Sequence, residues 1–139
     1  MELPTFLKTS GGKGLHITVP IERTIDWDEA KTFSGEIVKT LAENSDIFVA
    51  NMRKDLRGGK VYIDFHRNGR GATAVAPYST RARAGAPVSM PISWEELGKL
   101  SSAAHFTVET ACRYLSKRKQ DPWHEFEGSR IDLRKLVQT

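Results

Sequence analysis

The stretch KTSGGKGLH at residues 8–16 places three glycines and a lysine between a serine and a histidine. Glycine has no Cβ, so the backbone N–H groups of Gly11, Gly12 and Gly14 can approach a ligand closely. Ser10 adds a hydroxyl and Lys13 adds a positive charge, and an oxyanion such as phosphate suits this combination. The stretch is not a Walker loop, because the GxxxxGK[ST] order is absent and a strand is expected to follow. The alternative interpretation is a simple hairpin turn.

A second group of residues that could bind phosphate lies in APYSTRARAGAP, where Arg81 and Arg83 stand two positions apart. In an extended segment such side chains point the same way. Two guanidinium groups on one side would form a clamp for a polyphosphate. The surrounding region is strongly basic, with eight Lys or Arg and two Asp between residues 51 and 90. Such a field attracts phosphates, although a solvated basic surface is the simpler alternative.

Two predicted strands place a histidine and an aspartate where they could also do chemistry. Apolar and polar residues alternate over residues 15–19 and again over KVYIDFH at 60–66. This period-2 pattern predicts strands, with His16 and Asp64 each opposite the apolar face. If the strands are neighbours, both side chains share one polar surface. Otherwise Asp64 is a solvent-facing residue of an edge strand and His16 an ordinary hydrogen-bonded histidine.

The remaining elements predict an α+β fold in which helices flank a partly antiparallel sheet. Asp26 and Glu29 have capping-box spacing and predict the start of a long helix. Further helices are expected around 46–56, from Ser93, around 108–115 and over 130–137. Turns are expected at 57–60 and 67–72, a short strand at 73–76 and an irregular connection over 77–92.

The composition predicts one soluble domain of 139 residues with a net charge of +4. No apolar run is long enough for a membrane span, and the first residues lack the order of a signal peptide. The single cysteine, Cys112, cannot form an internal disulfide, so we expect a cytoplasmic location. The histidines and the cysteine show no zinc-binding spacing.

Three stretches together resemble the polymerase domain of bacterial DNA ligase D, a member of the archaeo-eukaryotic primase superfamily. They are FLKTSGGKGLHITVPI, KVYIDFHRNGRGATAVAPYSTRARAGAPVSMPISWEEL and the later DPW. The similarity extends from about residue 3 to about residue 122. It implies a fold related to half of a primase-polymerase domain, and a role in adding nucleotides to a 3′ end during non-homologous end joining of DNA.

The resemblance also implies a role for each motif residue. Ser10, Lys13 and His16 would bind the triphosphate and sugar of an incoming nucleoside triphosphate. Asp64 would be a catalytic ligand of the divalent metal ions, Mn²⁺ or Mg²⁺. Arg67 would touch the nucleotide. The phosphates would be held by Arg81 and Arg83.

The chain departs from the family pattern in one respect. The family's first half carries a DxD pair of metal-binding aspartates, expected upstream of residue 8, where this chain has only seven residues. Asp26 and Asp28 form DWD, but their position predicts an N-cap and a first-turn acidic residue. We therefore expect a single partial domain over 1–139 that resembles the C-terminal half of the polymerase domain.

Two functional hypotheses follow from this departure. In the first, the chain is part of a nucleotidyltransferase that works with a partner chain carrying the missing half. In the second, it is a non-catalytic remnant that still binds nucleotide or DNA. A purely structural remnant is a third, weaker alternative. An exposed sheet edge would favour a homo-oligomer in each case.

Overall fold

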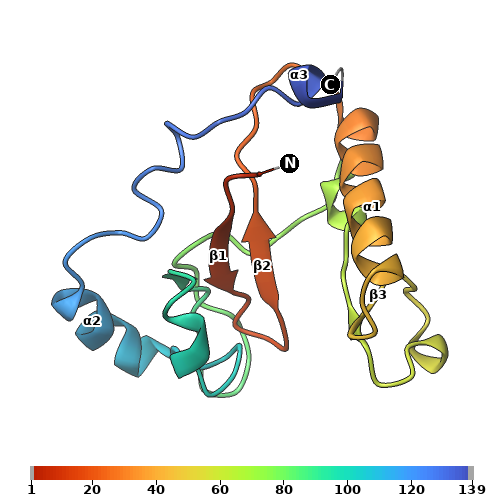
Figure 1. The fold of residues 1–139 in the computed structure, drawn as a ribbon. Coiled ribbons are helices and arrows are strands. Elements are labelled where there is room, and N and C mark those ends of the chain that lie inside the picture. Colours follow the sequence, from red (N-terminus) through yellow and green to blue (C-terminus); the bar gives the residue numbers. More distant parts are fainter. Residues whose placement is uncertain (1, 138–139) are drawn as a thin grey trace. The chain divides into compact units, whose positions relative to one another are not determined.

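The computed structural model describes residues 2–137, which divide into two compact units (Figure 1). The first unit contains residues 2–22 and 75–137, and the second contains residues 23–74. Both units mix short strands with helices, which confirms the α+β class. A single partial domain remains a prediction. None of the helices within residues 2–137 is both long and apolar enough to cross a membrane.

The first unit is built on a three-stranded antiparallel sheet with the order β2-β1-β5. Its strands are β1 (Phe6–Thr9), β2 (Leu15–Thr18) and β5 (Pro91–Ile92). β2 confirms the alternation seen in the sequence, but β1 and β5 were not expected. β1 is central and Leu7, Lys8 and Thr9 are all buried, so it shows no alternation. β5 falls inside the segment expected to be irregular, and its proline is tolerated at the edge of the sheet.

One face of this sheet packs into the main core of the first unit. Leu7, Met90 and Ile92 are each no more than 1% exposed and belong to one hydrophobic cluster with Phe106 and Ala111. Ala111 lies on α2 (Val108–Lys117), a helix that the sequence predicts and that begins after Thr107.

The C-terminal part of the first unit differs from the expected helices. Ser93 does not start an α-helix; it exchanges hydrogen bonds with Glu96 in a turn before the 3-10 helix η3 (Leu97–Lys99). The last helix, α3 (Leu133–Val137), is shorter than the predicted 130–137. A parallel bridge between Ile21 and Ile131 joins the end of the unit's first segment to its C-terminal segment.

The second unit is organised around α1 (Trp27–Glu43). The Asp26 carboxylate accepts hydrogen bonds from the N–H groups of Asp28 and Glu29, and the Glu29 carboxylate accepts one from the Asp26 N–H. This reciprocal pattern confirms the capping box predicted from the sequence. Asp26 and Asp28 therefore serve the start of the helix, as expected.

A two-stranded parallel sheet completes the second unit, with β3 (Phe48–Val49) beside β4 (Val61–Tyr62). The helix expected over 46–56 is wrong: the segment forms β3 and the 3-10 helix η1 (Lys54–Leu56). Gly58 and Gly59 adopt positive φ angles of 54° and 81° and form the predicted turn at 57–60. The expected strand at 60–66 is only two residues long, and residues 73–76 contain no strand.

Candidate phosphate-binding site

The glycine-rich stretch forms the loop that joins β1 to β2. Its shape is held by Ser10, whose hydroxyl accepts hydrogen bonds from the N–H groups of Gly12 (3.1 Å) and Gly14 (3.3 Å). Gly11 has a φ of 63°, and its N–H donates to the Ala103 carbonyl. The three glycine N–H groups are thus occupied within the protein. Binding of an anion by this conformation therefore depends on side chains rather than on free backbone donors.

The arginines lie on a hairpin over residues 78–89, which we call the arginine hairpin. Its two arms are joined by hydrogen bonds from the Ser89 N–H to the Ser79 carbonyl (2.9 Å) and from the Arg81 N–H to the Pro87 carbonyl (2.8 Å). Arg83 lies in the turn, where its N–H donates to the Arg81 carbonyl. The segment is therefore folded back on itself, and the expectation that extended backbone aligns the two arginines is wrong.

Both arginines nevertheless reach the glycine-rich loop. The Arg81 guanidinium donates to the Ser10 carbonyl at 2.9 Å, and the stem of this side chain covers Gly11. A Cβ added at Gly11 would lie 2.8 Å from Arg81 Cγ, so only glycine allows this approach. The guanidinium of Arg83 lies 3.7 Å from the equivalent Cβ position on Gly12. The tertiary fold brings two residues of one predicted motif onto a loop some seventy positions earlier.

The charge around this loop is not neutralised. Lys13 and Arg83 are exposed and Arg81 is half-buried. Within residues 2–137 none of these three side chains forms an ion pair with a carboxylate. Arg81 uses one of its donors on Ser10, which leaves the others of its five N–H groups for a ligand. The three cations suit a ligand that carries several negative oxygens.

His16 lies on β2, directly opposite Lys8 of β1 in the antiparallel register. Directly opposite residues of neighbouring strands point to the same face, so the two side chains share a surface. Lys8 is only 5% exposed, its ammonium donates to the Val75 carbonyl, and burial lowers the pKa of this lysine. The sequence interpretation missed Lys8. The signal that was available is a charged residue at the first position of the glycine-rich stretch.

Asp64 and Arg67 lie in the second unit. The Asp64 carboxylate accepts a hydrogen bond from the His66 N–H (3.1 Å) and pairs with the Arg67 guanidinium at 3.2 Å. Asp64 follows β4 and precedes the 3-10 helix η2 (His66–Asn68), so its expected position within a strand is wrong. His16 lies on β2 of the three-stranded sheet, whereas Asp64 follows β4 of the two-stranded sheet, so the condition that their strands pair as neighbours is not met.

Metal-ligating side chains do not cluster in the described part of the chain. No group of three or more His, Cys, Asp or Glu residues within residues 2–137 is arranged to hold a metal ion. Asp64 offers one carboxylate, and an arginine already neutralises it. Divalent ions such as Mg²⁺ need several oxygen ligands, so these residues alone do not fit a two-metal centre.

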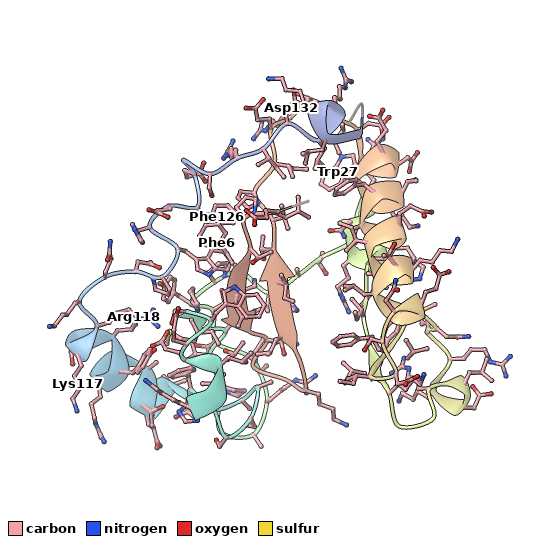
Figure 2. The ribbon with its side chains drawn as sticks, viewed as in Figure 1. Phe6, Trp27, Lys117, Arg118, Phe126 and Asp132 are labelled. Carbon is pink, nitrogen blue, oxygen red and sulfur yellow. The ribbon has the colours of Figure 1, made fainter. Side chains whose placement is uncertain are left out.

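The DPW motif at 121–123 holds the other end of the arginine hairpin. The Tyr78 hydroxyl donates to the Asp121 carboxylate at 2.6 Å, and the Trp123 indole donates to the Leu7 carbonyl at 2.9 Å. Trp123 also stacks on Phe126, and Phe126 meets Phe6 of β1 edge to face (Figure 2). Two effects raise the pKa of Tyr78 to about 12: burial is the larger, and the hydrogen bond to Asp121 is the next largest.

The glycine-rich loop and the arginine hairpin together form a basic surface on an α+β scaffold. The family described as LigD, primase-polymerase domain, matches residues 1–123. The chain belongs to this family, which confirms the resemblance seen in the sequence.

Individual relatives agree with this assignment. The chain is 44% identical, over 92% of its length, to the multifunctional non-homologous end joining protein LigD of Pseudomonas aeruginosa. It is 37% identical, over 70% of its length, to the protein of the same name from Mycolicibacterium smegmatis. It spans 16% and 13% of these two relatives.

A solved structure is similar as well. The polymerase domain from Mycobacterium tuberculosis ligase D, in complex with DNA, matches 93% of this chain with a TM-score of 0.79 and 28% identity. The match covers 45% of that domain. The fold of this chain is therefore related to somewhat less than half of a LigD polymerase domain.

Proposed function

We propose that this chain forms the triphosphate-binding part of a DNA repair polymerase that transfers nucleotides to a 3′ end in non-homologous end joining. The observation that carries the proposal is the approach of Arg81 and Arg83 to the Ser10–Gly14 loop. Lys13 extends from the same loop, so the three cations can meet one polyphosphate. His16, on the next strand, is proposed to contact the sugar. The curated LigD relatives are named for this repair pathway.

A divalent cation, Mn²⁺ or Mg²⁺, is proposed to bind only when the set of oxygen ligands is completed. Asp64 contributes one carboxylate, and the nucleotide triphosphate contributes phosphate oxygens. Further carboxylates would come from a metal-binding DxD pair other than Asp26 and Asp28, supplied by another part of the same protein or by a partner chain. Arg67 and the cation would compete for the Asp64 carboxylate. Arg67 would therefore release Asp64 when the cation binds, and is proposed to contact the nucleotide instead.

DNA is the second proposed ligand, because the similar solved domain was determined in complex with DNA. The exposed basic residues of the second unit suit phosphate contacts of the non-specific kind. Arg53 is partly neutralised by Asp55 at 2.6 Å, whereas Lys54 is exposed and forms no ion pair within the described residues. We propose that this unit contacts the DNA backbone, with an affinity that falls as salt rises.

The alternative is a non-catalytic module that retains nucleotide or DNA binding, which the single available carboxylate favours. Two measurements separate these functions. A triphosphate titration of the chain tests binding, and a primer-extension assay with Mn²⁺ tests catalysis, with and without the other half of a LigD polymerase domain added in trans. Extension only in the presence of that half supports the polymerase proposal. Triphosphate binding without extension in either mixture supports the binding module, and no binding contradicts both.

A further inference from the structure

Two buried hydroxyl groups lie directly behind the candidate site. Thr9 and Ser89 are each 0% exposed, although the surrounding core is largely apolar. Thr9 is the last residue of β1 and immediately precedes Ser10 of the glycine-rich loop, whereas Ser89 belongs to the returning arm of the arginine hairpin. Burying a hydroxyl is costly unless it is hydrogen-bonded, so the partners of these two residues indicate what they do.

The two hydroxyls bond across the gap between β1 and the arginine hairpin. The Ser89 hydroxyl donates to the Thr9 carbonyl at 2.7 Å. The Thr9 hydroxyl accepts the Met90 N–H at 2.9 Å and donates to the Val88 carbonyl at 3.2 Å. A backbone bond from the Thr9 N–H to the Met90 carbonyl, at 2.9 Å, completes the set. We call this set the Thr9–Ser89 lock.

The lock occupies the point where ordinary strand pairing stops. β1 pairs with β5 only at Leu7↔Ile92 and Lys8↔Pro91, and a proline donates no backbone hydrogen bond. Regular pairing between β1 and β5 therefore ends at Lys8, although Thr9 still pairs with Leu15 of β2 and its N–H still donates to the Met90 carbonyl. The side-chain hydroxyls continue the connection beyond this pairing, where β1 leads into the glycine-rich loop and β5 is preceded by the arginine hairpin.

Arg81, which donates to the Ser10 carbonyl, is close in sequence to this lock through both of the segments that it contacts. Ser10, which accepts from Arg81, is the residue after Thr9. On the other arm, Val88 forms an isolated bridge with Thr80, and Pro87 accepts from the Arg81 N–H. A shift of the hairpin relative to β1 would therefore move the Arg81 guanidinium away from the Ser10 carbonyl with little intervening chain to absorb it.

We propose that Thr9 and Ser89 are positioning residues that hold the arginine hairpin in register with the glycine-rich loop. Neither side chain contacts a ligand; each acts through the placement of Arg81. The expected effect on triphosphate binding rests on the proposed function above. The placement of the arginine hairpin rests only on the hydrogen bonds of Thr9 and Ser89 and is independent of that function.

The test uses the 139-residue chain and three single variants. Thr9→Val keeps the branched shape and removes the hydroxyl, whereas Thr9→Ser keeps the hydroxyl. Ile92→Val is the control, since it removes a buried methylene carbon from the same core without changing a hydrogen bond. We expect Thr9→Val to weaken triphosphate binding by about fivefold or more, and the other two variants to weaken it by less than about twofold.

A double variant separates positioning from general destabilisation. If Thr9 acts through Arg81, then Thr9→Val combined with Arg81→Ala binds triphosphate no more weakly than Arg81→Ala alone. Equal weakening by Thr9→Val and Ile92→Val would overturn the proposal, as would full additivity in the double variant. If Thr9→Val does not fold, Ser89→Ala takes its place, because it removes the donor to the Thr9 carbonyl.

Backbone amide exchange gives a readout that does not require nucleotide. We expect Thr9→Val to accelerate exchange of the Arg81 amide, which donates to Pro87, more than exchange of the Ala111 amide in α2. Equal acceleration at both amides contradicts the proposal. If the unmodified chain binds no triphosphate, the proposed function is wrong, and the exchange comparison alone then decides whether the lock positions the hairpin.

Discussion

The two arginines of the candidate site differ in one respect that a pair of alanine variants can measure. Arg81 donates to the Ser10 carbonyl at 2.9 Å, and Ser10 is buried. Arg83 is exposed, and its guanidinium makes no hydrogen bond within residues 2–137. Arg81→Ala should therefore lower both the free energy of unfolding and the affinity for triphosphate. Arg83→Ala should lower only the affinity.

The magnitudes follow from these contacts. A hydrogen bond from a charged donor contributes about 1.5–3 kcal/mol, and its loss leaves the buried Ser10 carbonyl without that partner. We expect Arg81→Ala to lower the free energy of unfolding by an amount in this range. Arg83→Ala should change the free energy of unfolding by less than about 0.5 kcal/mol. Each arginine that meets a phosphate contributes a similar charged hydrogen bond, so each variant should bind triphosphate about tenfold or more weakly.

Two assays measure the two quantities separately. Urea unfolding followed by tryptophan fluorescence gives the stability, and calorimetric titration at moderate salt gives the affinity. Arg113→Ala is the matched control, because it removes one exposed positive charge from α2 in the same unit. Unchanged triphosphate affinity in both arginine variants would refute the site. Equal losses of stability in both would refute the contact between Arg81 and Ser10.

Four further predictions test other parts of the structure. Gly11→Ala should destabilise the chain by about 1–2 kcal/mol in urea unfolding, because the backbone at Gly11 is left-handed. Gly14→Ala should change stability little, because no heavy atom lies within 4 Å of the added Cβ, and similar losses in the two variants would contradict the prediction. The Tyr78 pKa of about 12 lies above the usual 10, so the stability it contributes is present below pH 10 and is lost as the pH rises through 12; Tyr78→Phe should remove a tyrosinate absorbance step near that pH. Asp64→Asn should change stability by less than about 1 kcal/mol, since the pair with Arg67 is exposed, yet it should abolish most Mn²⁺ binding that depends on added triphosphate, as measured by paramagnetic relaxation. Ile17 is 60% exposed on β2, an edge strand among the described residues, so the chain should self-associate and Ile17→Lys should shift it toward monomer in light scattering.

Local chemistry determined the features that the sequence predicts correctly. The capping box at Asp26 and Glu29 depends on residues three positions apart, and the positive φ angles of Gly58 and Gly59 depend on the absence of a Cβ. α2 and β2 likewise follow from short-range periodicity. The pairing of Asp64 with Arg67 also joins residues three positions apart, although the sequence interpretation placed Asp64 in a strand instead of after one.

The motifs by themselves were sufficient to identify the family, because residue types and their spacing can be read from the sequence without knowledge of the fold. The same motifs contain the side chains of the candidate site. They could not show that the glycine N–H groups of the loop are occupied within the protein, since one of them bonds to Ala103 and the others bond to the Ser10 hydroxyl.

Tertiary structure decided what depends on contacts between distant segments. β1 and β5 escaped prediction because a central strand with three consecutive buried residues shows no alternation and a two-residue edge strand contains too little pattern. The approach of Arg81 to Ser10 joins residues 71 positions apart, and the bond from Ser89 to Thr9 joins residues 80 positions apart. No local propensity encodes such pairs: they form because buried polar groups must find partners wherever the packed core brings them together.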